Sequence, residues 1–197
     1  YAADHIDTIA SLAKSNGLAL HMDGARFANA LAALDVCAAD ATWRRGVDVL
    51  SFGATKGGAM AAEAVIFFRE ELAVAFGERR KRGGHLLSKM RFVSAQLDGY
   101  LTDNAWLRAA RTANAGTTRL AEGLVETNGV ILVRRPEANI VFVQLPPRIL
   151  DKLEADGFGF YRVGNDGTIR LVVPWSVTDA AIDSFVGAVR GHLSTTV

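Results

Sequence analysis

The fold of this chain is decided by two stretches, Leu18-Ala-Leu-His-Met-Asp-Gly-Ala-Arg26 and Val47-Asp-Val-Leu-Ser-Phe-Gly-Ala-Thr-Lys-Gly-Gly58. Each begins as a short apolar run and ends in polar residues and glycine. Short apolar runs bounded by glycine, with a helix-like segment between them, are typical of strands in a mostly parallel α/β sheet. Such sheets bind ligands at the carboxyl ends of their strands. The sequence therefore predicts that Asp23, Arg26 and Lys56 meet at a ligand-binding edge.

A lysine and a carboxylate at one sheet edge suit pyridoxal phosphate. This cofactor needs a lysine for its Schiff base and a charged partner for its pyridine nitrogen. Asp23 would keep that nitrogen protonated, because a nearby negative charge favours the charged form. Two simpler interpretations stay open: Asp23-Gly24 could be an ordinary turn, and Lys56 could be a surface lysine. The occurrence of both motifs in one chain favours the cofactor, and the glycine pair after Lys56 leaves room for a ligand.

The combination of His21-Met-Asp-Gly-Ala-Arg26 with Ser51-Phe-Gly-Ala-Thr-Lys-Gly-Gly58 resembles the low-specificity L-threonine aldolases, which are pyridoxal phosphate enzymes of the aspartate-aminotransferase-like group, fold type I. The resemblance runs on through Arg79 to Arg91 and through Ile169-Arg-Leu-Val-Val-Pro174. It implies an α/β fold in two parts. Residues 1–116 would be part of a large cofactor-binding domain with a mostly parallel sheet, and residues 117–197 a small α+β C-terminal domain.

The resemblance also implies an activity, the aldol cleavage of β-hydroxy-α-amino acids such as L-threonine and L-allo-threonine to glycine and an aldehyde. Lys56 and Asp23 would be the catalytic residues, and both would bind the cofactor together with Arg26 and Thr55. Arg170, with Arg26, would bind the substrate carboxylate, since a planar guanidinium suits a carboxylate. The base that takes the β-hydroxyl proton is not identifiable in this sequence.

Simpler interpretations of two of these residues also stay open. Thr55 could be a mere loop hydroxyl. Arg170 lies inside an apolar strand, where a charge needs a partner or an opening to a site, but an exposed arginine on an edge strand would satisfy the same pattern.

The chain resembles the C-terminal part of such an enzyme. The glycine loop that holds the phosphate and the aromatic or histidine that stacks on the ring belong to the first part in that family, and neither is identifiable here. Two alternatives to the aldolase follow. One is another pyridoxal-phosphate lyase, acting by β-elimination, and the other is a non-catalytic C-terminal fragment that needs an N-terminal part.

Composition narrows the possible partners. The formal net charge is +1, and no basic stripe with interleaved aromatic residues appears, so nucleic acid is not an expected partner. No metal site is expected.

No apolar run is long enough to span a membrane, which favours a soluble, cytoplasmic protein. The single cysteine, Cys37, fits a reducing compartment and is expected to be a small buried hydrophobe. The family resemblance implies a homo-oligomer, a dimer or tetramer.

Periodicity and end signals predict the remaining elements. A helix over 4–16 would be capped by Asp4 and stopped by Gly17, and a long helical region over 70–115 would break at Gly83-Gly84. From Thr117 a β-β-α-β-α pattern predicts a small antiparallel sheet with helices on one face. Its elements are a leading helix to about residue 127, strands over 130–133, 140–144 and 168–173, a helix after Pro146-Pro147, and a helix over 179–192 capped by Thr178.

Overall fold

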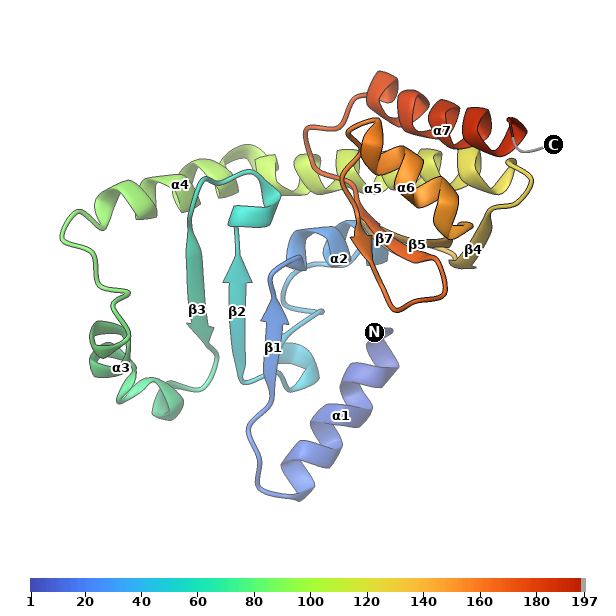
Figure 1. Cartoon of the computed structure of the whole chain (residues 1–197). Helices are drawn as coiled ribbons and strands as arrows, with labels where there is room; N and C mark the ends of the chain where they lie inside the picture. The colour runs from blue at the N-terminus through green and yellow to red at the C-terminus, as the bar shows by residue number, and fades with distance from the viewer. Residues whose placement is uncertain (196–197) are drawn as a thin grey trace. The chain divides into compact units, whose positions relative to one another are not determined.

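The computed structural model describes residues 1–195, and the chain divides into two compact units, Tyr1–Arg108 and Ala109–Val197. The first unit holds a three-stranded sheet with the order β1-β2-β3 (Figure 1). β1 and β2 are parallel, and β3 returns antiparallel to β2. The elements are α1 (Ala3–Ser15), β1 (His21–Gly24), α2 (Phe27–Leu34), β2 (Val49–Gly53), β3 (Glu63–Phe67), α3 (Phe76–Arg82), α4 (Arg91–Leu101) and short 3-10 turns between them.

One face of this sheet packs into an aromatic core. Leu50 and Phe52 alternate along β2 and are buried, since alternate strand residues point to the same face. Phe52 lies edge-on to Trp106, with ring centroids 5.7 Å apart, and its ring centroid lies 6.1 Å from that of Tyr100. Phe27 completes the cluster from α2. Tyr100 and Trp106 therefore belong to the core of this unit.

Two local predictions in this unit are wrong. Asp4 is not the N-cap of α1, which begins one residue earlier, after Ala2. Asp4 lies in the first turn, where a negative charge is favourable beside the helix N-terminus. Cys37 is exposed rather than buried, and its thiol donates to Asp40 Oδ2 at 3.0 Å. The reason is that α2 ends at Leu34 and the chain leaves the core before it reaches Cys37.

The long helical region is interrupted twice. The predicted break at Gly83-Gly84 is confirmed, because α3 ends at Arg82 and Gly84 has φ +76°. A second break follows α4 at Asp103 and Asn104, which have positive φ values of 51° and 56°. α5 (Ala105–Val125) then begins, so the helix expected from Thr117 is the second half of a longer one.

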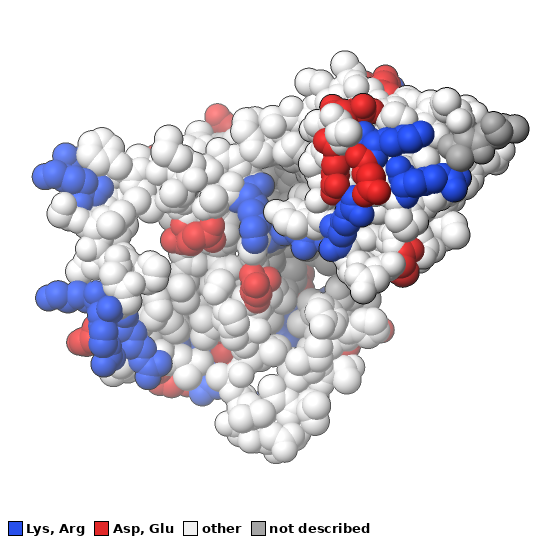
Figure 2. Space-filling view, in the orientation of Figure 1, with Lys and Arg blue, Asp and Glu red and all other residues white. Residues whose placement is uncertain are grey.

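α3 carries basic residues in its last turn, and Figure 2 shows blue side chains gathered over it.

The second unit is an antiparallel sheet with the order β4-β5-β7-β6. Val141, Val143, Ile169 and Leu171 point to one face and pack with helical side chains such as Leu124. The prediction of a small antiparallel sheet with helices on one face is therefore confirmed. The elements are β4 (Ile131–Arg134), β5 (Ile140–Gln144), α6 (Pro147–Ala155), β6 (Tyr161–Arg162), β7 (Thr168–Val172) and α7 (Asp179–Ser194).

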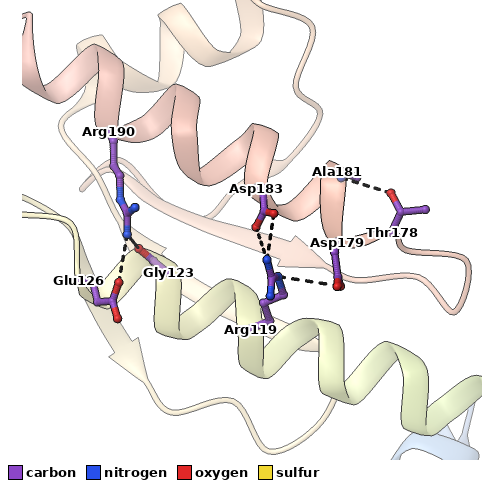
Figure 3. Close-up of polar contacts among 8 residues, drawn as sticks. All are labelled: Arg119, Gly123, Glu126, Thr178, Asp179, Ala181, Asp183 and Arg190. Atoms are coloured by element: carbon purple, nitrogen blue, oxygen red, sulfur yellow. Dashed lines mark hydrogen bonds and ion pairs between the residues drawn. The ribbon is translucent and has the colours of Figure 1, made fainter.

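Exposed ion pairs join α7 to α5 and to Glu126, the residue just after α5, within this unit (Figure 3). Arg119 Nη2 lies 2.7 Å from Asp183 Oδ1, and Arg190 Nη2 lies 3.2 Å from Glu126 Oε2. Thr178 Oγ1 accepts from Ala181 N at 3.2 Å, which confirms the predicted N-cap of α7. The division into domains after residue 116 stays a prediction, and the boundary between the two compact units also falls within α5.

Candidate active site

The parallel pair β1 and β2 brings the two motifs to one edge of the sheet. Asp23 pairs in register with Ser51, and Gly24 with Phe52. Because the strands run in the same direction, the turn after Gly24 and the turn after Gly53 lie at the same edge. A Cβ added at Gly53 would lie 2.9 Å from Ala25 Cα, so the first turn lies directly against the end of β2.

The Asp23 carboxylate lies on the face of the sheet opposite the aromatic core. Met22 packs against that core, and Asp23 therefore points to the other side and is exposed. Its Oδ1 accepts from Ala25 N at 2.9 Å, which orients the group. His21 shares this face, and its Nε2 lies 2.8 Å from Ser51 Oγ. His21 thus bonds to the neighbouring strand β2.

Lys56 lies in a short 3-10 turn, Thr55–Gly57, just beyond β2. Its side chain is exposed, whereas Ala54 before it is fully buried. The loop is closed behind Lys56 by two bonds, Ala54 N to Ala62 O at 3.1 Å and Ala62 N to Thr55 Oγ1 at 3.2 Å. The Thr55 hydroxyl therefore accepts a hydrogen bond within the loop. Its expected bond to a phosphate remains a prediction.

Two side chains of α4 contact the Lys56 loop, and sequence reasoning assigned neither contact. Gln96 Oε1 accepts from Met60 N and Ala61 N, both at 3.0 Å. Tyr100 lies against Gly57, where an added Cβ would overlap its hydroxyl. No local pattern could have revealed these contacts, because about forty residues separate the partners.

Burial, with a smaller contribution from the charge of Glu63, raises the pKa of Tyr100 to about 12. The phenol beside the Lys56 loop is therefore neutral at ordinary pH.

Arg26 lies at the start of α2 and is partly buried, at the same sheet edge as Asp23. The turns after β1 and β2 thus place Asp23, Arg26, Thr55 and Lys56 at one edge of the sheet in the first unit. No helix among residues 1–195 has the length and apolar character that crossing a membrane requires. No three potential metal ligands cluster in that part of the chain either.

Arg170 belongs to the second unit. It lies on the sheet face opposite the helices, between Phe142 of β5 and Tyr161 of β6. Its guanidinium stacks on the Tyr161 ring, 4.9 Å from the centroid. Its Nε is buried and has no hydrogen-bond partner among the described residues. The strand therefore holds a pre-oriented guanidinium whose hydrogen-bonding capacity is not fully used.

A family model for beta-eliminating lyases matches residues 1–146. The chain is 41% identical over 194 residues to a low-specificity L-threonine aldolase from a Pseudomonas species, covering 98% of this chain and 56% of the relative. It is 45% identical over 175 residues to another from Pseudomonas aeruginosa, covering 89% and 51%. The chain thus spans about half the length of the curated relatives it matches.

Solved structures agree with these matches. A threonine aldolase from Leishmania major superposes with a TM-score of 0.89 at 29% identity, over 98% of this chain and 57% of that one. A lysine aminotransferase from Mycobacterium tuberculosis superposes with a TM-score of 0.64 at 20% identity, over 100% and 46%. The second likeness concerns the fold alone, and it agrees with the fold type expected from the sequence.

Proposed function

The chain belongs to the beta-eliminating lyase family, and from that premise we propose that it is the lysine-bearing part of an L-threonine aldolase. The reaction is the cleavage of L-threonine, L-allo-threonine and similar β-hydroxy-α-amino acids to glycine and an aldehyde. The observation that carries the proposal is the meeting of Asp23 and the Lys56 loop at the carboxyl edge of the parallel pair. The relatives named as threonine aldolases support the choice of reaction.

The residues at this edge fit pyridoxal phosphate, the cofactor of this family and of its structural neighbours. Lys56 offers an exposed amine followed by glycine, and Asp23 offers an exposed carboxylate on the same edge. When bound, the cofactor supplies an electron sink for the bond that breaks. Lys56 would be its covalent attachment point.

Asp23 would hold a proton on the pyridine nitrogen, because a carboxylate stabilises a positive charge a few ångströms away. The bond from Ala25 N to Oδ1 fixes the carboxylate and leaves Oδ2 for that proton. Arg26 would donate to the phenolic oxygen of the cofactor or to the substrate carboxylate, and Thr55 to the phosphate. Both donors lie on the two turns that meet at this edge.

Arg170 would bind the substrate α-carboxylate. A guanidinium offers donors in a planar fork that matches a carboxylate. Stacking on Tyr161 keeps this fork in one orientation before the substrate arrives. The orientation of the carboxylate in turn selects which bond of the amino acid is cleaved.

The first prediction concerns Lys56. In the full-length enzyme, Lys56→Ala should reduce aldehyde release from L-threonine to the uncatalysed rate, because the cofactor has lost its attachment point. Lys152→Ala removes an exposed lysine of α6 and serves as the matched control. Aldehyde release is followed by coupled reduction of the aldehyde, and sustained release by Lys56→Ala would overturn the assignment.

Cofactor attachment can be tested without turnover. The absorbance of the purified chain is recorded with pyridoxal phosphate, borohydride makes the link permanent, and peptide mapping locates it. A label on Lys56 supports the proposal. A label that appears only in the full-length enzyme means that this chain carries the lysine without a complete site, the fragment alternative. No label in either protein overturns the cofactor assignment.

β-Elimination is the second candidate activity, and the family description itself favours it. The lysine and the carboxylate would serve both reactions, so the residues do not separate them. Product analysis does: glycine with an aldehyde indicates aldol cleavage, whereas an α-keto acid with ammonia indicates elimination.

We further propose that the enzyme is a cytoplasmic homo-oligomer, a dimer or tetramer, on the basis of the single cysteine and the family resemblance. Light scattering of the full-length enzyme gives the number of subunits, and a monomer would contradict this part of the proposal.

A further inference from the structure

The Lys56 loop, residues 54–62, has two kinds of attachment. Behind the lysine, the Ala54 carbonyl accepts from Gly57 N at 2.9 Å and from Ala59 N at 3.1 Å. These bonds, with those of Thr55 to Ala62, hold the loop to itself. They leave its tip, Met60-Ala61, without a local partner.

Gln96 of α4 holds that tip. Its Oε1 accepts from Met60 N and Ala61 N, both at 3.0 Å, and its Nε2 donates to Phe92 O at 3.1 Å. The amide therefore has one consistent orientation, with the oxygen toward two donors and the nitrogen toward a carbonyl. A single side chain satisfies two adjacent backbone donors of the loop.

Burial does not hold the tip in place. Met60 is 87% exposed and Ala61 is exposed, so neither side chain anchors the loop in the core. The second contact from α4 is Tyr100, one helical turn beyond Gln96, and it touches Gly57. The two contacts flank the region that follows Lys56, and both come from one face of α4.

We propose that Gln96 is a positioning residue for Lys56, acting through the backbone of Met60 and Ala61. This inference rests on the proposed function of Lys56. A loop held at its tip presents the lysine amine from a narrow set of backbone conformations, and catalysis depends steeply on such placement. Gln96 touches neither the cofactor nor the substrate in this role.

Three substitutions in the full-length enzyme separate this role from packing. Gln96→Leu keeps most of the bulk and removes the single oxygen that accepts both bonds. Gln96→Glu keeps an acceptor oxygen for Met60 N and Ala61 N and loses only the Nε2 donor to Phe92 O. Ser94→Ala is the matched control, because Ser94 is an exposed residue of α4 whose hydroxyl donates to Met90 O, four residues earlier in the same segment.

The first readout needs no activity. Hydrogen exchange in the cofactor-free enzyme is measured on the peptide that contains Met60 and Ala61. In Gln96→Leu these two amides should exchange roughly tenfold faster, the factor expected for loss of a hydrogen bond. Gln96→Glu and Ser94→Ala should exchange like the parent enzyme.

The second readout is catalytic and spectroscopic. Gln96→Leu should lower kcat by roughly tenfold to a hundredfold through misplacement of the lysine, with KM little changed. The pH at which the bound cofactor changes its absorbance should also shift. In Gln96→Glu both properties should return toward those of the parent. If only the volume of the side chain mattered, Gln96→Leu and Gln96→Glu would behave alike.

Three outcomes overturn the inference. Unchanged exchange and kcat in Gln96→Leu would show that the contact is dispensable, and equal impairment of Gln96→Leu and Gln96→Glu would indicate packing. Absence of cofactor on Lys56 in the parent enzyme would overturn the proposed function and this inference with it. Should Gln96→Leu fail to fold, Gln96→Asn, whose amide is one methylene too short to reach the tip, is measured in its place against the same expectations.

Discussion

Tyr100 shows how one residue can couple the core of the first unit to the Lys56 loop. Its ring packs with Phe52 and Trp106, while its hydroxyl lies against Gly57. Burial first, and the charge of Glu63 second, raise its pKa to about 12. The folded state therefore favours the neutral phenol.

This shift predicts a pH dependence of stability. Because the pKa of Tyr100 is higher in the folded state than in the unfolded state, its contribution is fully present below about pH 10 and is lost between about pH 10 and 12. The loss should be on the order of 2 kcal/mol in the free energy of unfolding. Urea unfolding of the cofactor-free full-length enzyme and of Tyr100→Phe, at pH 8 and at pH 11 to 12, measures it.

The difference between the two proteins isolates this phenol from other groups that titrate at high pH. The advantage of the parent over Tyr100→Phe should shrink as the pH rises. A constant difference across the window would show that the phenol ionises as easily in the folded state as in the unfolded chain.

At the scale of elements, α7 depends on how it begins. Thr178 has an extended backbone, and its hydroxyl accepts from Ala181 N, which satisfies one of the free donors of the first turn. α1 begins after Ala2 with no such bond. A sixteen-residue helix that packs over the sheet of the second unit therefore has a defined start.

Removing this cap should weaken the second unit. Thr178→Ala is expected to lower the free energy of unfolding by about 1 kcal/mol, because the Ala181 amide loses its acceptor. Thr178→Ser keeps a hydroxyl and should remain close to the parent. Urea unfolding compares the two, and equal losses in both variants would show that the methyl group matters rather than the oxygen.

At the scale of the whole molecule, stability comes from two separate cores. One is the aromatic cluster under the three-stranded sheet, and the other surrounds Leu124, Val143 and Ile169. The ion pairs that Arg119 and Arg190 form are exposed, so screening by water keeps their contribution small.

A substitution in one core should therefore act mainly on its own unit. Leu124 is fully buried, and Leu124→Ala should cost about 2–5 kcal/mol. Arg119→Met, which removes the exposed pair with Asp183, should cost no more than about 1 kcal/mol. Hydrogen exchange should show the loss of protection in Leu124→Ala concentrated in residues 109–195, and an equal loss in the first unit would contradict separate cores.

Local signals explain what could be predicted. The apolar runs ahead of Asp23 and Lys56, the glycine pair at 83–84 and the Thr178 cap all act over a few residues, so their elements were correctly predicted. The predictions that were wrong or missing also result from the use of local signals alone. Asp4 was an acceptable cap by type, and the two-residue strand β6 is too short to leave a periodic pattern.

The sequence by itself determined the fold class, the family and the presence of the two strands that lead to Asp23 and to the Lys56 loop, because these follow from local periodicity and motif identity. Only the tertiary structure decided that Gln96 holds the tip of the Lys56 loop, that Tyr100 lies against Gly57, and that Arg170 stacks on Tyr161. Those contacts join residues far apart along the chain. They depend on how helices and strands pack, which no window of sequence contains.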